Sequence, residues 1–246
     1  MPRSAPSDPS EATRWCLVVP VKRLGHAKSR LGGPRVPPAL REQLALAFAT
    51  DAVSAALSAQ RVTAVLVVTD DPTAGAVLGA LGAIVVPDEP DAGLNAAFAF
   101  GARTARAKLG TDIGVAASAA DLPALRSGEL DIALGRIVDK LHEIDEGDIT
   151  LTRHHNKRFF VPDAHDIGTT MLFAPPGVEL APRFGGPSKT AHSASGAIEL
   201  TGPDISSLRR DVDTAEDLAA ALLLGVGPAT AMVWSQRDGS GAGPGV

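Results

Sequence analysis

Cysteine and long apolar runs are almost missing from this chain of 246 residues. A lone Cys16 lies within an apolar segment, so an internal disulfide is excluded and a small buried side chain is expected. No apolar run approaches the roughly 20 residues of a membrane-spanning helix, and residues 1–14 are too polar for a secretory signal. The net charge is −5, which argues against an extended nucleic-acid surface. These absences predict a cytoplasmic protein with neither a membrane nor a nucleic acid as its partner.

The composition suits one α/β domain that is long enough to bury a core, since 45% of the residues are hydrophobic and 21% are charged. Residues 1–13 are rich in proline, serine and charge, and residues 235–246 are rich in glycine. Both compositions are typical of disordered tails. The sequence therefore predicts a single domain over residues 14–234.

Between the tails, strand-like apolar segments alternate with helical ones, which is the signature of βαβ units. The pattern predicts a Rossmann-like α/β fold with a central, mainly parallel sheet flanked by helices. The expected strands are residues 15–21, 62–69, 83–87, 113–117, 149–152, 158–161, a segment within 163–173, and 197–200. The expected helices are residues 38–60, 73–81, 96–108, 127–143 and 215–224, with a short one beginning near residue 188.

Asp121 follows a strand of small residues and stands just before Leu122 and Pro123. Because a proline disfavours helix in the residue before it, the chain must turn at this point. The carboxylate is thus presented at the end of a central strand, where open α/β sheets bind ligands. A helix cap is the alternative role for this acid.

A second acidic segment, residues 209–214 (RRDVDT), precedes the last predicted helix. Asp213 has Glu216 three residues later, which is the spacing of a capping box with Asp213 as the cap. Asp211 has no such structural role, although it could pair with Arg209 or Arg210 on the surface. If Asp211 meets Asp121 across a cleft, the two would suit Mg²⁺, which takes one or two carboxylates together with substrate phosphates.

The loop after the first strand, residues 22–31, carries several cations among a glycine and a serine. Cations at this end of the sheet are placed to hold a polyphosphate, with arginine as a two-pronged donor and lysine as a point charge. The glycine spacing is not that of a Walker loop, and a solvated basic loop is the alternative. Asn95 could cap the helix that follows it or read the edge of a base. The candidate nucleotide-binding residues are Lys22, Lys28, Arg30 and Asn95.

Two glycine-containing turns could bind small anions. Gly168 and Thr169 offer a backbone N–H and a hydroxyl, although a simple turn into a strand explains them equally well. In the second turn, Gly185 frees the backbone and Ser188 stands at the expected start of a short helix, where exposed N–H groups bind anions. Lys189 adds positive charge. Together with the acids and the basic loop, these turns suit a nucleotidyltransferase, whose catalysis is mostly positioning and charge neutralisation.

Five segments that follow one another over roughly residues 15–231 point to one family of nucleotidyltransferases: VPVKRLGHAKSRL, ADLPAL, GTT, RFGGPS and DVDTAEDL. They resemble the archaeal and actinobacterial guanylyltransferases of deazaflavin coenzyme F-420 biosynthesis. The resemblance implies a nucleotide-diphospho-sugar transferase fold and the transfer of GMP from GTP to phosphoenolpyruvate or 2-phospho-L-lactate, with release of pyrophosphate. The later LGVGPAT is similar to actinobacterial members and favours phosphoenolpyruvate.

By the same resemblance, the family's metal carboxylates fall on Asp121 and Asp211, with Mg²⁺ as the implied ion, and its phosphoenolpyruvate contacts fall on Thr169, Gly185 and Ser188. Three alternatives stay open: 2-phospho-L-lactate as the acceptor, another nucleotidyltransferase of this fold, and a nucleotide-binding protein without activity. A homodimer is also left open.

Overall fold

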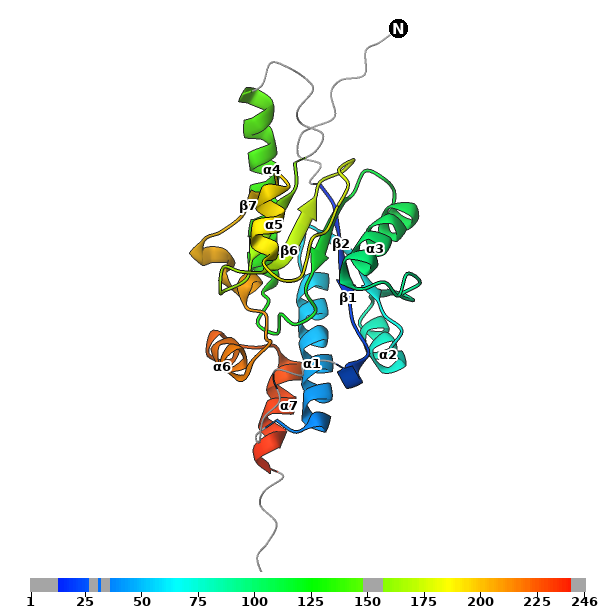
Figure 1. Cartoon of the computed structure of the whole chain (residues 1–246), viewed down its shortest axis with the longest axis vertical. Coiled ribbons are helices and arrows are strands. Elements are labelled where there is room, and N and C mark those ends of the chain that lie inside the picture. Colours follow the sequence, from blue (N-terminus) through cyan, green and yellow to red (C-terminus); the bar gives the residue numbers. More distant parts are fainter. Residues whose placement is uncertain (1–12, 27–30, 32–35, 148–156, 240–246) are drawn as a thin grey trace, which may run out of the picture.

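The computed structural model describes residues 13–26, 31, 36–147 and 157–239. One sheet holds the strands in the order β3-β2-β1-β4-β6-β5-β7, and Figure 1 shows this sheet among the helices. Among these strands, only β6 runs antiparallel to its neighbours. The mainly parallel sheet predicted from the sequence is therefore confirmed. The strands are β1 (Trp15–Pro20), β2 (Val62–Val68), β3 (Ile84–Val86), β4 (Gly114–Ser118), β5 (Phe159–Pro162), β6 (Thr169–Ala174) and β7 (Ile198–Glu199).

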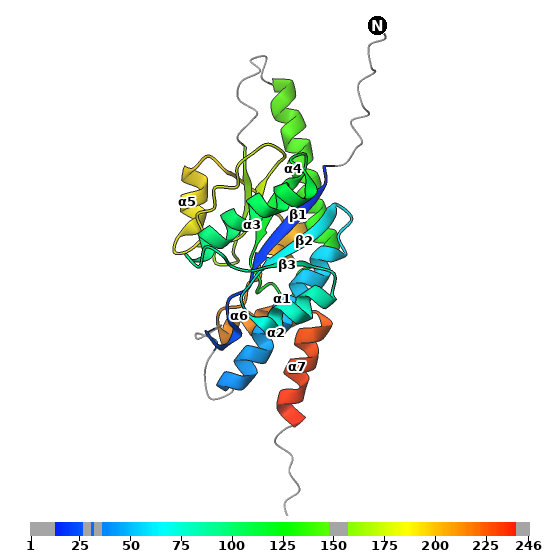
Figure 2. The same cartoon turned by 90° about the vertical axis from the view of Figure 1, so that its right-hand side faces the viewer.

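Helices cover both faces of the sheet, as the view in Figure 2 shows. In the described ranges, no helix has both the length and the apolar character needed to cross a membrane. The α-helices are α1 (Pro38–Leu57), α2 (Pro72–Ala80), α3 (Leu94–Leu109), α4 (Ser127–Gly147), α5 (Ser188–Ala194), α6 (Ala215–Leu224) and α7 (Pro228–Gly239). The described residues also include the 3₁₀ helices η1 (Leu24–His26) and η4 (Pro203–Arg209).

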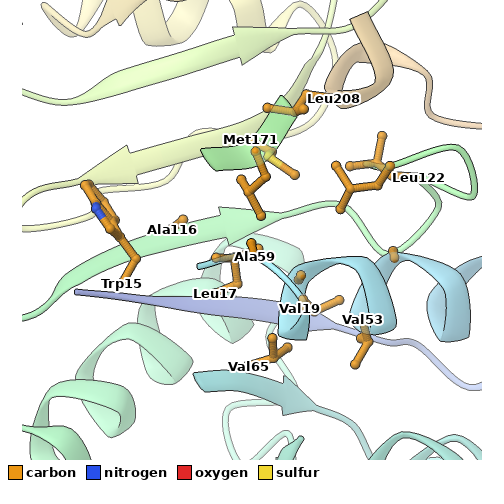
Figure 3. Close-up of a cluster of buried hydrophobic side chains, with 14 of the residues drawn as sticks. Trp15, Leu17, Val19, Val53, Ala59, Val65, Ala116, Leu122, Met171 and Leu208 are labelled. Atoms are coloured by element: carbon orange, nitrogen blue, oxygen red, sulfur yellow. The ribbon is translucent and has the colours of Figure 1, made fainter. Parts of the chain in front are cut away.

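The alternating side chains of β1 separate the core into two layers. Leu17 and Val19 face α1, α2 and α4, in the cluster that Figure 3 shows in part. Cys16 and Val18 point to the opposite face, where α3 supplies Phe98. Alternation follows from the two-residue repeat of a strand, so both layers are built by the same short segment. Burial raises the pKa of the Cys16 thiol to about 12, which fits its expected role as an inert core residue.

Helix boundaries agree with the sequence where local capping decides them. Asp71 stands just before Pro72 and caps α2: its carboxylate accepts hydrogen bonds from the backbone N–H groups of Thr73 and Ala74. The cap of α6 is one residue later than predicted. Thr214, with Asp217 three residues on, forms the capping box in place of Asp213 and Glu216.

The C-terminal helix α7 is absent from the sequence-based expectations and runs into residues 235–246, which were expected to be disordered. A contact with α1 explains it. The buried Asp51 of α1 accepts hydrogen bonds from the N–H groups of Ala229 and Thr230, at 3.0 and 2.8 Å. The expected strand at 149–152 lies outside the described residues.

Because α3 packs closely on β1, a single methyl group added at Gly101 should destabilise the fold. A β-carbon at Gly101 would lie 2.3 Å from Val18 Cγ1. We therefore expect Gly101→Ala to lower the free energy of unfolding by about 1–3 kcal/mol, as overpacking of a core typically does. Gly128→Ala is the matched control, because nothing lies within 4 Å of its β-carbon, and it should raise stability by about 0.5 kcal/mol through helix propensity. Urea unfolding measures both, and an unchanged midpoint for Gly101→Ala would contradict the packing.

Candidate active site

A pocket of about 230 Å³ opens where β1, β2 and β3 end and α3 begins. Parallel strands present their carboxyl ends together at this edge of a sheet, which is where open α/β folds bind ligands. Lys22 lies in the wall of the pocket, and its contact with a nucleotide stays a prediction. The full lining is Pro20, Val21, Lys22, Arg23, Val68, Asp70, Asp88, Asp91, Gly93, Leu94 and Ala97.

The basic loop leaves β1 beside this pocket and is tied to the end of β2. The backbone N–H of Leu24 donates to Asp71 Oδ2 at 3.0 Å. Burial raises the pKa of Asp71, but the hydrogen bonds from the N–H groups of Ala74, Leu24 and Thr73 together lower it by more. The pKa of Asp71 is therefore below its usual value. Asp71 therefore caps α2 and anchors the start of the loop at once. Lys28 and Arg30 lie outside the described residues, and their triphosphate role stays a prediction.

Asn95 is not the cap of α3, because the helix begins at Leu94 and Gly93 occupies the cap position. The Asn95 amide instead makes two hydrogen bonds to the main chain of Phe184. Its Nδ2 donates to the Phe184 carbonyl at 2.9 Å, and its Oδ1 accepts from the Phe184 N–H at 2.7 Å. Asn95 is not among the residues that line the pocket. A base-reading role for Asn95 stays a prediction, while its observed contact is with the predicted acceptor loop.

The segments that carry the two candidate metal ligands lie side by side. The Val212 N–H donates to the Asp121 carbonyl at 3.0 Å, which places the start of the α6 segment against the end of β4. The side chains of Asp121 and Asp211 are both half-buried. Among the described residues, no group of three or more His, Cys, Asp or Glu side chains could hold a metal ion. A site with two carboxylates fits Mg²⁺, which completes its shell with phosphate oxygens and water.

The loop between β5 and β6 reaches α6 through His165, a residue that the sequence did not single out. His165 Nε2 lies 2.8 Å from Asp217 Oδ1, and Asp217 is the acid of the capping box. The hydrogen bond to Asp217 is the main cause that raises the pKa of His165, with the charges of Asp217, Asp163 and Asp211 adding to it. This contact holds the loop that leads to Thr169 against the start of α6, directly after the acidic segment.

The predicted acceptor residues lie on adjoining segments. Thr169 is the first residue of β6, and Ser188 is the first residue of α5; both are buried. Gly185 lies in the turn before α5 at φ 101°, a left-handed conformation that favours glycine. The buried His192 of α5 joins these parts. Its Nδ1 lies 2.9 Å from Thr169 Oγ1, and its Nε2 accepts from the Arg183 N–H at 3.0 Å.

Two of the backbone donors expected to bind an anion are already used within the protein. The Gly168 N–H donates to Asp163 Oδ2 at 2.7 Å, and the Ser188 N–H donates to the Gly186 carbonyl at 2.9 Å. The ammonium group of Lys189 pairs with Asp166 and Glu199, at 2.9 and 3.2 Å. The expectation of free N–H groups at Gly168 and Ser188 is therefore wrong, because these turns satisfy their own donors. The hydroxyl groups of Thr169 and Ser188 stay the candidate contacts.

Solved structures show the same fold. A protein assigned as a nucleotide-diphospho-sugar transferase from Desulfovibrio desulfuricans G20 matches with a TM-score of 0.59, at 13% identity over 92% of this chain and 96% of that one. A cytidylyltransferase from Leptospira borgpetersenii matches with a TM-score of 0.51, at 11% identity over 93% and 95%. At such low identity the likeness establishes the fold alone. No protein-family model matches the chain.

The fold and the sequence relatives together define the class of this protein, which is a nucleotidyltransferase. The phosphoenolpyruvate guanylyltransferase of Salinispora arenicola is 52% identical over 219 residues, covering 89% of this chain and 92% of the relative. That of Streptomyces avermitilis is 51% identical over 218 residues, covering 89% and 93%. The chain belongs to the phosphoenolpyruvate guanylyltransferase family.

Proposed function

We propose that this enzyme transfers GMP from GTP to phosphoenolpyruvate. A phosphate oxygen of phosphoenolpyruvate attacks the α-phosphorus of GTP, the bond from that phosphorus to the bridging oxygen breaks, and pyrophosphate leaves. The product is enolpyruvoyl-2-diphospho-5'-guanosine. The resemblance of the sequence motifs implies that this product is an intermediate of coenzyme F-420 biosynthesis. The proposal is supported by two observations: the segments of Asp121 and Asp211 lie side by side where β4, the neighbour of β1, ends, and the chain is about half identical to phosphoenolpyruvate guanylyltransferases.

On the donor side, Asp121 and Asp211 would hold Mg²⁺, which neutralises charge on the phosphates. Lys22 lies in the wall of the pocket and is placed to contact the triphosphate. The part of the pocket at the start of α3 can receive the nucleoside, because Gly93 allows the backbone to approach a ligand closely. Catalysis then consists of alignment of two anions and compensation of their charge.

On the acceptor side, Thr169, Gly185 and Ser188 would bind the phosphate and carboxylate of phosphoenolpyruvate. 2-Phospho-L-lactate carries the same two anionic groups and is the second candidate. The two acceptors differ at C2, which is planar in one and tetrahedral in the other. A difference of about one small group typically changes the binding free energy of a substrate by only 1–3 kcal/mol. The preference for phosphoenolpyruvate therefore rests on the similarity to phosphoenolpyruvate guanylyltransferases.

A competition experiment tests this proposal. The enzyme is given limiting GTP, Mg²⁺ and equal concentrations of the two acceptors, and the products are separated by mass. We expect mostly the enolpyruvoyl product. A predominance of the lactyl product would make the acceptor wrong and leave the donor reaction standing. Absence of pyrophosphate with either acceptor would favour another nucleotidyltransferase or a binding protein without activity.

The basic loop gives a separate prediction for the donor. Lys28→Ala and Arg30→Ala should each weaken GTP binding, while the affinity for the acceptor changes less, because each removes a cation that we place on the triphosphate. Lys108→Ala is a matched control, since this lysine lies in the last turn of α3, away from the helix start that lines the pocket. Titration calorimetry with GTP measures the effect. Wild-type affinity in both variants would leave the loop as a solvated turn.

A further inference from the structure

His192 is a buried polar residue that no sequence motif indicated. It is fully buried in α5 and packs against two aromatic rings, with ring centroids 5.8 Å from Phe160 and 5.2 Å from Phe184. A histidine in such a place could be simple core packing. Both of its ring nitrogens, however, have a partner, and both partners belong to the acceptor side of the site.

The hydrogen bonds determine which ring nitrogen carries the proton. A backbone N–H can only donate, so the Arg183 N–H requires an unprotonated Nε2. The proton of the neutral ring is therefore on Nδ1, which donates to Thr169 Oγ1 at 2.9 Å. Burial, helped by the charges of Arg158 and Arg183, lowers the pKa of His192 to about 4, against a smaller opposing effect of the Ser188 carbonyl. The ring is therefore neutral at physiological pH.

This tautomer fixes the polarity of the Thr169 hydroxyl. The oxygen accepts from His192, so the hydroxyl hydrogen is left to be donated to another oxygen. An anionic ligand offers only acceptors, and a hydroxyl held in this way is prepared to bind one. The same ring holds the Arg183 N–H, two residues before Gly185, while Asn95 holds Phe184 from the other side. Hydrogen bonds to side chains of two helices, α3 and α5, therefore hold the turn before α5.

We propose that His192 is the positioning residue of the acceptor site: its Nδ1–H orients the Thr169 hydroxyl, and its Nε2 holds the turn that leads to Gly185. The inference rests on the proposed function, because the ligand that these groups meet is phosphoenolpyruvate. His192 acts through Thr169 and the turn and does not itself touch the reacting atoms.

Three substitutions separate the two hydrogen bonds. His192→Asn places an amide nitrogen near the Nδ1 position and keeps the donor to Thr169. His192→Gln places an oxygen near the Nε2 position and keeps the acceptor for Arg183. His192→Phe keeps a ring of similar shape and loses both. Phe160→Leu is the control, because it disturbs the packing around the ring and leaves both hydrogen bonds in place.

Steady-state release of pyrophosphate gives KM for each substrate and kcat. We expect His192→Phe to lower kcat/KM for phosphoenolpyruvate by about 10-fold or more, with KM for GTP within about twofold, because buried donors and acceptors lose their partners. His192→Asn should retain the most activity, since the Thr169 hydroxyl is the group that meets the ligand. Phe160→Leu should lose stability without this change in KM. The inference is overturned if folded His192→Phe keeps wild-type kinetics, or if Phe160→Leu reproduces the change in kcat/KM for phosphoenolpyruvate.

A spectroscopic readout is independent of turnover. In nitrogen-15 spectra, His192 should show a protonated Nδ1 and an unprotonated Nε2 at neutral pH, and the Nδ1–H signal should shift when phosphoenolpyruvate is added. The opposite tautomer would overturn the inference even in an active enzyme. Wild-type protein that gives the expected tautomer but no guanylyl transfer and no shift with phosphoenolpyruvate would refute the proposed function together with the role of His192 at its acceptor.

Discussion

Asp121→Asn is expected to lower turnover about 100-fold or more while the fold stays intact. The substitution keeps the size of the side chain and removes one charge from a site that would hold Mg²⁺ against a triphosphate, a loss comparable to that of one strong electrostatic contact. The Val212 N–H donates to the backbone carbonyl of Asp121, so a change of the Asp121 side chain leaves this hydrogen bond in place. Asp211→Asn should behave in the same way.

The measurement is the initial rate of pyrophosphate release at saturating GTP, phosphoenolpyruvate and Mg²⁺, with circular dichroism to verify folding. Asp213→Asn is the matched control. Asp213 is exposed, and the side-chain cap of α6 is formed by Thr214 and Asp217, so no capping side chain is lost. Near-normal turnover in Asp121→Asn would rule out its assignment as a metal ligand.

Thr169→Val should reduce kcat/KM for phosphoenolpyruvate by about 10-fold or more, and Ser188→Ala should act in the same direction. Each removes a hydroxyl aimed at an anion, and hydrogen bonds to charged groups are worth roughly 1.5–3 kcal/mol. In Thr169→Val the Nδ1–H of His192 also loses its acceptor hydroxyl. GTP binding should be nearly unchanged, because these residues lie outside the pocket lining.

The next residue in the chain supplies the control for Thr169→Val. Thr170 is fully buried, and its hydroxyl donates to the Val161 carbonyl on β5 at 3.2 Å. Thr170→Val makes the same chemical change on the other face of β6, so it should cost stability and leave KM for phosphoenolpyruvate within about twofold. Equal kinetic losses in the two variants would indicate that Thr169 acts through the sheet and not through its hydroxyl.

Local patterns predicted the elements well where neighbouring residues decide the outcome. The proline after Asp71 and the free N–H groups of the next turn are close in sequence, so the start of α2 follows from local capping. The bounds of α6 were predicted correctly, but its cap was assigned one residue too early because two overlapping capping boxes were available, Asp213 with Glu216 and Thr214 with Asp217. Asp217 also bonds His165, 52 residues earlier, and this distant contact accompanies the observed choice.

The helix α7 shows why composition alone misled the prediction. Its glycine-rich continuation indicates a disordered tail, yet its first N–H groups are bound by Asp51, which lies 178 and 179 residues earlier in the chain. Such a cap leaves no pattern near the helix it stabilises. The helix therefore could not be predicted from the residues that form it.

By itself, the sequence determined the alternation of strands and helices, the mainly parallel sheet and the family, because strand and helix periods and ordered motifs are local properties. The tertiary structure alone decided which polar groups of the site are already occupied. Asn95 binds Phe184, Gly168 donates to Asp163, and His192 joins Thr169 to the turn at Arg183. The physical reason is that a hydrogen bond needs its two partners within about 3 Å, and only the folded chain brings residues so far apart in sequence to that distance.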